Sequence, residues 1–187
     1  MKIGVLALQG DFREHRLALE KLGVETVEVR LAEDLEGLEG LILPGGESTT
    51  MGKLMTDYDM LEPLRAFGAA YAMWGTCAGA ILLSQNVGRE QPLLKLMDTE
   101  LERNAFGRQC ESFEINLPLA GLEGGLFHAV FIRAPVVTRA GPTLNVLARL
   151  QKGIVALESG KHMALSFHPE LGDDTRLHER FLRLNGI

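Results

Sequence analysis

The sequence contains little cysteine, no long apolar run and no block of like charges. Two cysteines among 187 residues are too few for a disulfide scaffold, and they lack the paired spacing of a zinc site. A reducing compartment, the cytoplasm, therefore suits this chain. The formal net charge of -6 argues against a nucleic-acid binder that holds its ligand on a broad basic face.

No segment has the apolar length of a membrane span or of a secretory signal. The N-terminal apolar stretch runs only from Ile3 to Leu8, which is too short for either. No sustained repeat, low-complexity segment or Pro/Gly/Ser-rich linker divides the chain. Its length and its hydrophobic content of 46% suit one globular core, so we expect residues 1–187 to form a single domain.

Short apolar runs alternate with helical patterns, which predicts an α/β fold around a mostly parallel sheet. Asp11 and Glu14 have the spacing of a capping box, and they open a predicted helix that ends at Gly23. Further helices are expected at 60–69, 78–85 and 173–184. Strands or strand-like alternation are expected at 2–8, 27–31, 40–43, 71–76, 114–117, 130–135, 144–150, 154–158 and 163–167.

Cys77 stands at the corner between a predicted strand and a predicted helix. The sequence from Gly75 to Gly79 is G-T-C-A-G, the thiol version of the nucleophile elbow G-x-S-x-G. Small flanking residues are needed because strand and helix meet closely at such a corner, and the helix dipole favours a thiolate. A free cysteine more commonly packs as a small hydrophobe, so this motif by itself leaves both interpretations open.

His168 and Glu170 form a second candidate group near the end of the chain. In an extended chain their side chains project from the same face, and Pro169 favours that geometry. A carboxylate beside an imidazole fixes its tautomer and supports the imidazolium. Cys77, His168 and Glu170 are therefore predicted as nucleophile, base and orienting residue. A metal site built from His168, Glu170 and a further histidine lacks a second spaced pair.

The remaining histidines lack such a setting. We expect partly solvated surface positions or packing roles for His15, His128, His162 and His178.

Two adjacent glycines, Gly45 and Gly46, follow the strand predicted at 40–43. Glycines at this point free the backbone to present N–H groups to a ligand. We expect the backbone N–H groups of Gly46 and Ala78 to form an oxyanion hole beside Cys77. The alternative is an ordinary strand-to-helix loop in which Ser48 is the N-cap.

Three motifs together resemble the triad-type (class I) glutamine amidotransferases. They are P-G-G-E-S-T at 44–49, G-T-C-A-G at 75–79 and F-H-P-E-L at 167–171. Further segments at 8–15, 102–109, 112–114 and 131–135 make the chain similar to the glutaminase subunits of pyridoxal 5'-phosphate synthases. This resemblance covers nearly the whole chain and implies a flavodoxin-like, three-layer fold. Small departures are Cys110, where an aliphatic residue is expected, and the loop from Gly88 to Lys95.

The resemblance implies an activity and a set of substrate-binding residues. Cys77 would attack the side-chain carboxamide of L-glutamine, and water would then release L-glutamate from the thioester, with no cofactor. The residues implied to bind glutamine are Gly46, Glu47, Ser48, Arg103, Ile132 and Arg133. Apart from the family pattern, Arg103 and Arg133 would be interpreted as surface ion pairs.

The resemblance also implies a partner, because the expected single domain has no second site to use the ammonia. That partner would be the synthase subunit PdxS, in an assembly of twelve synthase and twelve glutaminase subunits. Candidate docking residues are Gln9, Gly10, Arg13, Glu14 and His15, whose alternative is an ordinary solvated helix. A glutaminase for another acceptor, such as imidazole glycerol phosphate synthase, a non-catalytic amidotransferase-like module and a cysteine peptidase stay open as alternatives.

Overall fold

A computed structural model describes residues 1–107 and 112–186 of the chain, so Cys110 lies outside the described residues. The helices are α1 (Phe12–Lys21), α2 (Ser48–Asp57), α3 (Leu61–Ala70), α4 (Ala78–Leu83) and α5 (Arg176–Leu184), with 3-10 turns η1 (Ala32–Leu35) and η2 (Pro169–Leu171). The strands are β1 (Lys2–Leu6), β2 (Glu25–Val29), β3 (Gly40–Leu43), β4 (Ala72–Thr76), β5 (Thr99–Glu102), β6 (Ser112–Leu117), β7 (Phe127–Ile132), β8 (Val136–Ala140), β9 (Asn145–Leu150), β10 (Gly153–Glu158) and β11 (Met163–Leu165).

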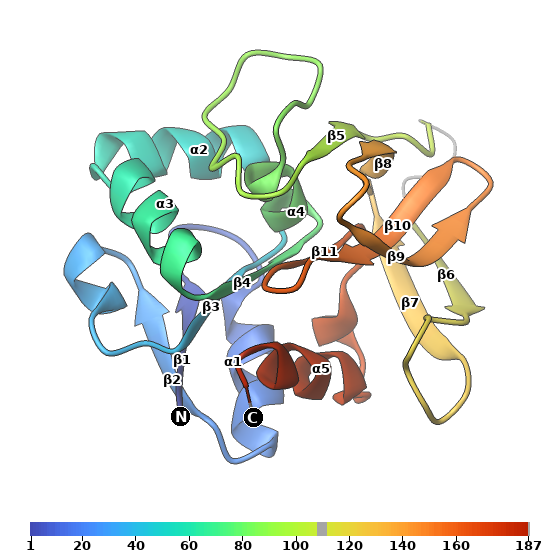
Figure 1. Ribbon diagram of the computed structural model, residues 1–187, viewed down its shortest axis with the longest axis horizontal. Coiled ribbons are helices and arrows are strands. Elements are labelled where there is room, and N and C mark those ends of the chain that lie inside the picture. The colour runs from blue at the N-terminus through green and yellow to red at the C-terminus, as the bar shows by residue number, and fades with distance from the viewer. Residues whose placement is uncertain (108–111, 187) are drawn as a thin grey trace.

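Most of these strands join one curled sheet (Figure 1). Its order is β2-β1-β3-β4-β11-β10-β8-β5, with β9 paired to β10. The pairs from β2 to β11 are parallel, whereas β10 pairs antiparallel with β11, β9 and β8, and β5 with β8. Strands β6 and β7 form a separate antiparallel hairpin. The predicted α/β class is confirmed, and its parallel part is the half of the sheet that the N-terminal strands build.

The sheet separates two apolar cores, which gives the three layers seen in Figure 1. Along β3, Leu41 and Leu43 face one core and Ile42 faces the other, because strand side chains alternate between faces. Helices α2, α3 and α4 cover the first core, and helices α1 and α5 cover the second. None of the helices in the described ranges is long and apolar enough to cross a membrane.

The carboxyl ends of β1, β3, β4 and β11 lie at one edge of the sheet. These four strands run parallel, with Ile3 beside Gly40, Leu43 beside Gly75 and Leu165 beside Thr76. Ligands of open α/β sheets bind at this edge, where the loops that leave the strands converge. The fold thus brings together segments that are far apart in the sequence.

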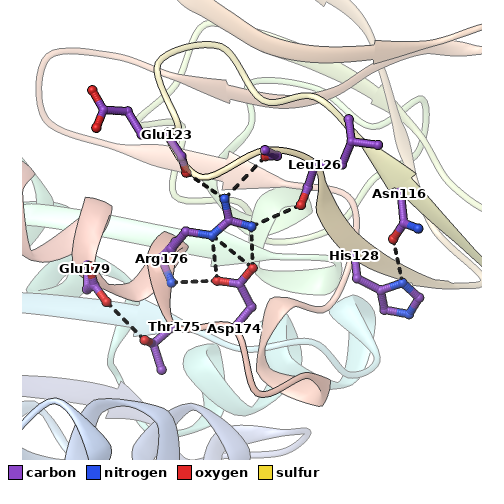
Figure 2. A network of polar contacts seen from close by, with 9 residues as sticks. Asn116, Glu123, Leu126, His128, Asp174, Thr175, Arg176 and Glu179 are labelled. Atoms are coloured by element: carbon purple, nitrogen blue, oxygen red, sulfur yellow. Dashed lines mark hydrogen bonds and ion pairs between the residues drawn. The ribbon is translucent and has the colours of Figure 1, made fainter.

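Arg176 at the start of α5 holds the β6–β7 hairpin against the rest of the protein, as Figure 2 shows. Its guanidinium donates to the carbonyl oxygens of Glu123, Gly125 and Leu126 at 2.6, 3.3 and 3.1 Å. Asp174 accepts from the same guanidinium at 2.6 Å, and this hydrogen bond lowers the pKa of Asp174. Strand β7 therefore has a fixed position, and its far end reaches the edge described above.

Several predicted elements are confirmed, and the differences have local causes. The capping box is wrong, because the Asp11 side chain makes no capping bond to α1. The strand predicted at 130–135 ends at Ile132, where Arg133 takes a left-handed φ of 43°. The expected strands do not include β5 or β8. Strand β5 is only four residues long and contains two glutamates, and burial does not alternate along β8.

We expect Gly79→Ala to lower the free energy of unfolding by about 1–3 kcal/mol. A Cβ at Gly79 would lie 1.9 Å from the carbonyl oxygen of Leu43, so β3 and α4 would have to separate. Urea unfolding provides the measurement. Gly160→Ala is the matched control, since no heavy atom lies within 4 Å of its Cβ position. Equal unfolding midpoints for the two variants would contradict the prediction.

Candidate active site

Cys77 occupies the corner between β4 and α4 in a strained backbone conformation. Its φ and ψ are 48° and -104°, a region that non-glycine residues enter at a cost of about 1–3 kcal/mol. Its N–H donates to the carbonyl oxygen of Leu165 at 2.8 Å, which ties the corner to β11. A Cβ at Gly75 would lie 2.4 Å from the backbone of Gly79, so both flanking glycines are sterically required. The predicted elbow geometry is confirmed.

His168 and Glu170 are buried and in direct contact. The Nδ1 atom of His168 lies 2.8 Å from Oε1 of Glu170, and the two residues are 4% and 6% exposed. The extended geometry predicted for this segment is wrong. Strand β11 ends at Leu165, and the chain then turns at Pro169 into η2, which brings the carboxylate back to the imidazole.

The environment of His168 favours the imidazolium. Burial by itself lowers the pKa of His168, but hydrogen bonds with Asp11, Cys77 and Glu170 outweigh it and raise the pKa above its ordinary value. Burial raises the pKa of Glu170 and contact with His168 opposes this rise, so the two groups titrate as a coupled pair. A histidine that stays protonated beside a cysteine stabilises the thiolate.

Asp11 is a member of this group that the sequence analysis missed. Its Oδ2 lies 3.4 Å from Nδ1 of His168, and its N–H donates to the carbonyl oxygen of Gly45 at 3.0 Å. The signal for it in the sequence is its place in the loop between β1 and α1, at the carboxyl edge of the sheet. Side-chain atoms of Asp11, His168 and Glu170 lie within 4.8 Å of one another, and the hydrogen bond between His168 and Glu170 already occupies the atoms that a metal would need.

Two loops interlock above the sheet edge. Oε1 of Gln9 accepts a hydrogen bond from the N–H of Glu47 at 2.8 Å. A Cβ at Gly10 would lie 1.8 Å from the carbonyl oxygen of Gly45, and a Cβ at Gly46 would lie 2.5 Å from Oε1 of Gln9. Gly10 and Gly46 have φ values of 98° and 155°, so the loops meet through backbone that favours glycine. The position of one loop therefore sets that of the other.

A cavity of about 390 Å³ opens at this edge, a volume suited to a small ligand. Apart from the buried Glu170, its lining contains all residues predicted to be catalytic, to form the oxyanion hole or to bind glutamine. They are Gly46, Glu47, Ser48, Cys77, Ala78, Arg103, Ile132, Arg133 and His168. The hairpin completes the wall, since the carbonyl oxygen of Ile132 lies 3.8 Å from Sγ of Cys77.

Glu47 and Arg103 place both signs of charge in the cavity. Nη2 of Arg103 lies 2.7 Å from Oε1 of Glu47. Although partial burial opposes it, hydrogen bonds from Thr49 and Thr50 lower the pKa of Glu47 to about 2. Glu47, and not Ser48, is the N-cap of α2, and it accepts from the N–H of Thr50 at 2.8 Å. A carboxylate and a guanidinium at one site suit a zwitterionic ligand.

The histidines and the docking candidates divide by exposure. His15 is fully buried, which makes it wrong as a surface docking residue. His162 and His178 are buried in packing positions, and His128 lies exposed on the hairpin. The other docking candidates, Gln9, Gly10, Arg13 and Glu14, keep accessible surface, and the first two also line the cavity.

Comparisons with known proteins agree with this geometry. The model of the SNO glutamine amidotransferase family matches residues 5–185. The pyridoxal 5'-phosphate synthase subunit PdxT of Thermus thermophilus is 55% identical over 99% of this chain and 98% of its own length. PdxT of Deinococcus radiodurans is 55% identical over 100% of this chain and 98% of its own length. A crystal structure of a glutamine amidotransferase has a TM-score of 0.92, with 55% identity and 99% coverage of both chains.

A more distant structure shows the shared fold alone. It is a glutamine amidotransferase from Thermotoga maritima, with a TM-score of 0.61 and 13% identity. The match covers 98% of this chain and 83% of the other. The class I glutamine amidotransferase resemblance drawn from the sequence is confirmed by the family match and the more similar structure.

We expect Asp11→Asn to move the alkylation of Cys77 by iodoacetamide to higher pH. Removing a carboxylate destabilises the imidazolium of His168 and with it the thiolate. The shift should be smaller than that of Glu170→Gln, because the Asp11 side chain is 42% exposed and farther from Nδ1. Mass spectrometry of the Cys77 peptide measures the rates.

The control for this experiment is Asp173→Asn, whose carboxylate pairs with Lys21 at the surface. It should leave the pH profile unchanged. A larger shift for Asp11→Asn than for Glu170→Gln would show that the assigned order of the two carboxylates is wrong.

Proposed function

The chain belongs to the SNO glutamine amidotransferase family, and from this premise we propose that it is the glutaminase subunit of a pyridoxal 5'-phosphate synthase. It hydrolyses L-glutamine to L-glutamate and ammonia through Cys77, His168 and Glu170. The observation that carries the proposal is the strained Cys77, which lines a small charged cavity together with the protonated imidazole. We further propose that the chain acts as one domain, in the cytoplasm.

In the first half of the reaction, the Cys77 thiolate attacks the carboxamide carbon of glutamine. The carbonyl oxygen becomes an oxyanion, for which the backbone N–H groups of Gly46 and Ala78 are the proposed donors. His168 gives its proton to the amide nitrogen, the C–N bond breaks, and ammonia leaves a glutamyl thioester. Glu170 keeps the imidazole oriented, since it accepts from Nδ1 and leaves the other ring nitrogen for this transfer.

In the second half, His168 takes a proton from water, and the hydroxide adds to the thioester carbon. Collapse of the second tetrahedral intermediate breaks the C–S bond and releases glutamate. The thiolate and the imidazolium are then restored. The same donors hold both oxyanions, so the loop bearing Gly46 must keep its position through the whole cycle.

The charged residues of the cavity suggest how the α-amino and α-carboxylate groups of glutamine are bound. The α-ammonium of glutamine needs an acceptor, and Glu47 stays ionised because of its low pKa. The α-carboxylate needs donors, for which Arg103 and Arg133 are available in the lining. Oγ of Ser48 is buried and has no hydrogen-bond partner among the described residues, so it is free to meet the ligand.

Ammonia released to water would largely protonate, which favours direct delivery to an acceptor enzyme. We propose the synthase subunit PdxS as that acceptor, in an assembly of twelve synthase and twelve glutaminase subunits. Docking through Gln9, Gly10, Arg13 and Glu14 has physical support, because the loop of Gln9 and Gly10 interlocks with the loop that carries Gly46. Contact with a partner there would reach the oxyanion hole directly.

We expect Cys77→Ala to abolish glutamate release while it leaves the fold and the binding of the synthase intact. The substitution removes the nucleophile and keeps the Cβ, so the backbone strain is unchanged and the urea midpoint should change little. Glutamate release from glutamine is measured with and without purified synthase, and the wild type should be stimulated by it. Retained hydrolysis in the variant would rule out the nucleophile, and equal wild-type rates would count against activation by docking.

We expect Glu47→Gln to raise the KM for glutamine about tenfold or more, because a hydrogen bond to a charged group contributes about 1.5–3 kcal/mol. The amide can still accept from Thr50, so α2 keeps its cap. Steady-state glutaminase kinetics with the synthase present provide the measurement. The exposed Glu33→Gln is the matched control and should not change KM. An unchanged KM for Glu47→Gln would contradict the assigned ammonium contact.

A further inference from the structure

A row of buried polar side chains lies behind Glu170, on the side away from the cavity. Nε2 of His15 is 3.3 Å from Oε2 of Glu170 and 3.1 Å from Oγ1 of Thr76. Nδ1 of His15 is 3.1 Å from Nε2 of His178. His15, Thr76 and His178 are fully buried, and they come from α1, β4 and α5. Helices α1 and α5 cover the same face of the sheet (Figure 1).

The second oxygen of Glu170 needs a donor that the triad itself does not supply. His168 contacts Oε1, and Oε2 is buried and has no hydrogen-bond partner among the described residues. A buried carboxylate oxygen that lacks a donor destabilises the ionised form, and this favours protonation of the acid. The imidazole of His15 is placed to reduce that destabilisation at 3.3 Å.

The two buried histidines can share their protons in only one way that serves Glu170. Burial lowers the pKa of His15 well below its usual value and lowers the pKa of His178 to about 4. Both rings are therefore neutral and carry one proton each. If His15 holds its proton on Nδ1, its Nε2 lone pair faces the Glu170 carboxylate. If the proton is on Nε2, the N–H donates to Oγ1 of Thr76 at 3.1 Å and stays beside Oε2 of Glu170, which lies 3.3 Å from Nε2. His178 then donates through its own Nε2 to Nδ1 of His15. The negative charge of Glu170 selects the second pattern.

We propose that His15 is a positioning residue of the active site, which holds Glu170 ionised and oriented through its Nε2–H while His178 maintains that tautomer. The inference rests on the proposed glutaminase function, because it assigns His15 a task for the same triad. The titratable groups that face this row are Asp11, His168 and Glu170 on the cavity side and His178 on the other. No substrate contact is assigned to His15.

Loss of the donor from His15 has a definite sign. Glu170 would be protonated at higher pH, the imidazolium of His168 would lose its counter-charge, and the thiolate of Cys77 would be destabilised. We expect His15→Leu to move Cys77 alkylation upward by about one pH unit, the size of effect that one hydrogen bond to a carboxylate produces. The kcat should fall about tenfold, because a shift of one pH unit lowers the ionised fraction of the thiol about tenfold. The KM for glutamine should stay within twofold, because His15 does not contact the substrate.

Two amide variants separate the donor from the packing. In His15→Gln the amide nitrogen can occupy the place of Nε2, and the pH profile should return most of the way to that of wild type. In His15→Asn the shorter side chain cannot reach Oε2, and the profile should match that of His15→Leu. If His15→Leu does not fold, the Gln and Asn pair still decides the question. Equal profiles for Gln and Asn would overturn the proposal.

A double-mutant comparison tests whether His15 acts through Glu170. Adding His15→Leu to Glu170→Gln should cause no further loss of kcat and no further pH shift, because the carboxylate is already gone. Independent, additive losses would overturn the proposal. His162→Leu is the matched control for removing a buried histidine, since the one hydrogen bond described for its imidazole is accepted from the N–H of Met73 at 3.1 Å. It should lower stability and leave the pH profile unchanged.

The alkylation assay uses neither glutamine nor the synthase, so it separates two failures. Absence of glutamate release by wild-type protein with synthase would refute the proposed function. The pH profiles of Cys77 would still decide whether His15 controls Glu170.

Discussion

The parallel pairing of β4 with β11 is the constraint on which the active site depends. Thr76 lies beside Leu165, so both strands end at the same level, and the N–H of Cys77 bonds to the carbonyl oxygen of Leu165. Because one chain then turns sharply into a helix and the other into a 3-10 turn, the thiol and the imidazole meet across the edge. The left-handed backbone of Cys77 persists only because packing around Gly75 and Gly79 holds it.

Burial shifts the pKa values of His168 and Glu170, and it also makes the charged pair unfavourable for the stability of the fold. Desolvation acts against both charged forms, and their mutual contact with Asp11 and Cys77 restores the imidazolium. Because of this balance, each of the groups around His168 affects whether the thiol of Cys77 is ionised. The buried side chains behind the carboxylate of Glu170, which are His15, Thr76 and His178, therefore belong to the same electrostatic network as the residues that line the cavity. They do so although helices α1 and α5 cover them.

The interlocked loops connect the surface of the protein to the cavity beside Cys77. Gln9 and Gly10 are partly accessible, and they contact the Gly45 and Gly46 segment through atoms that leave no space for a side chain. The hairpin on the opposite wall is anchored differently, since Arg176 fixes its connection to α5 (Figure 2). One wall of the cavity thus contains partly accessible loop residues, whereas the other is fixed through Arg176.

The sequence by itself determined the α/β class, the corner at Cys77 and the pairing of His168 with Glu170, because these follow from local periodicity, from steric demands on glycine and from short spacing. The family pattern in separate segments also identified the residues that line the cavity. Only the tertiary structure decided that Asp11 faces His168 instead of capping α1, and that His15 is buried behind Glu170 instead of exposed for docking. The reason is that a helical pattern indicates which face of α1 is buried but not which polar groups, from β4, α5 and η2, meet that face inside the protein.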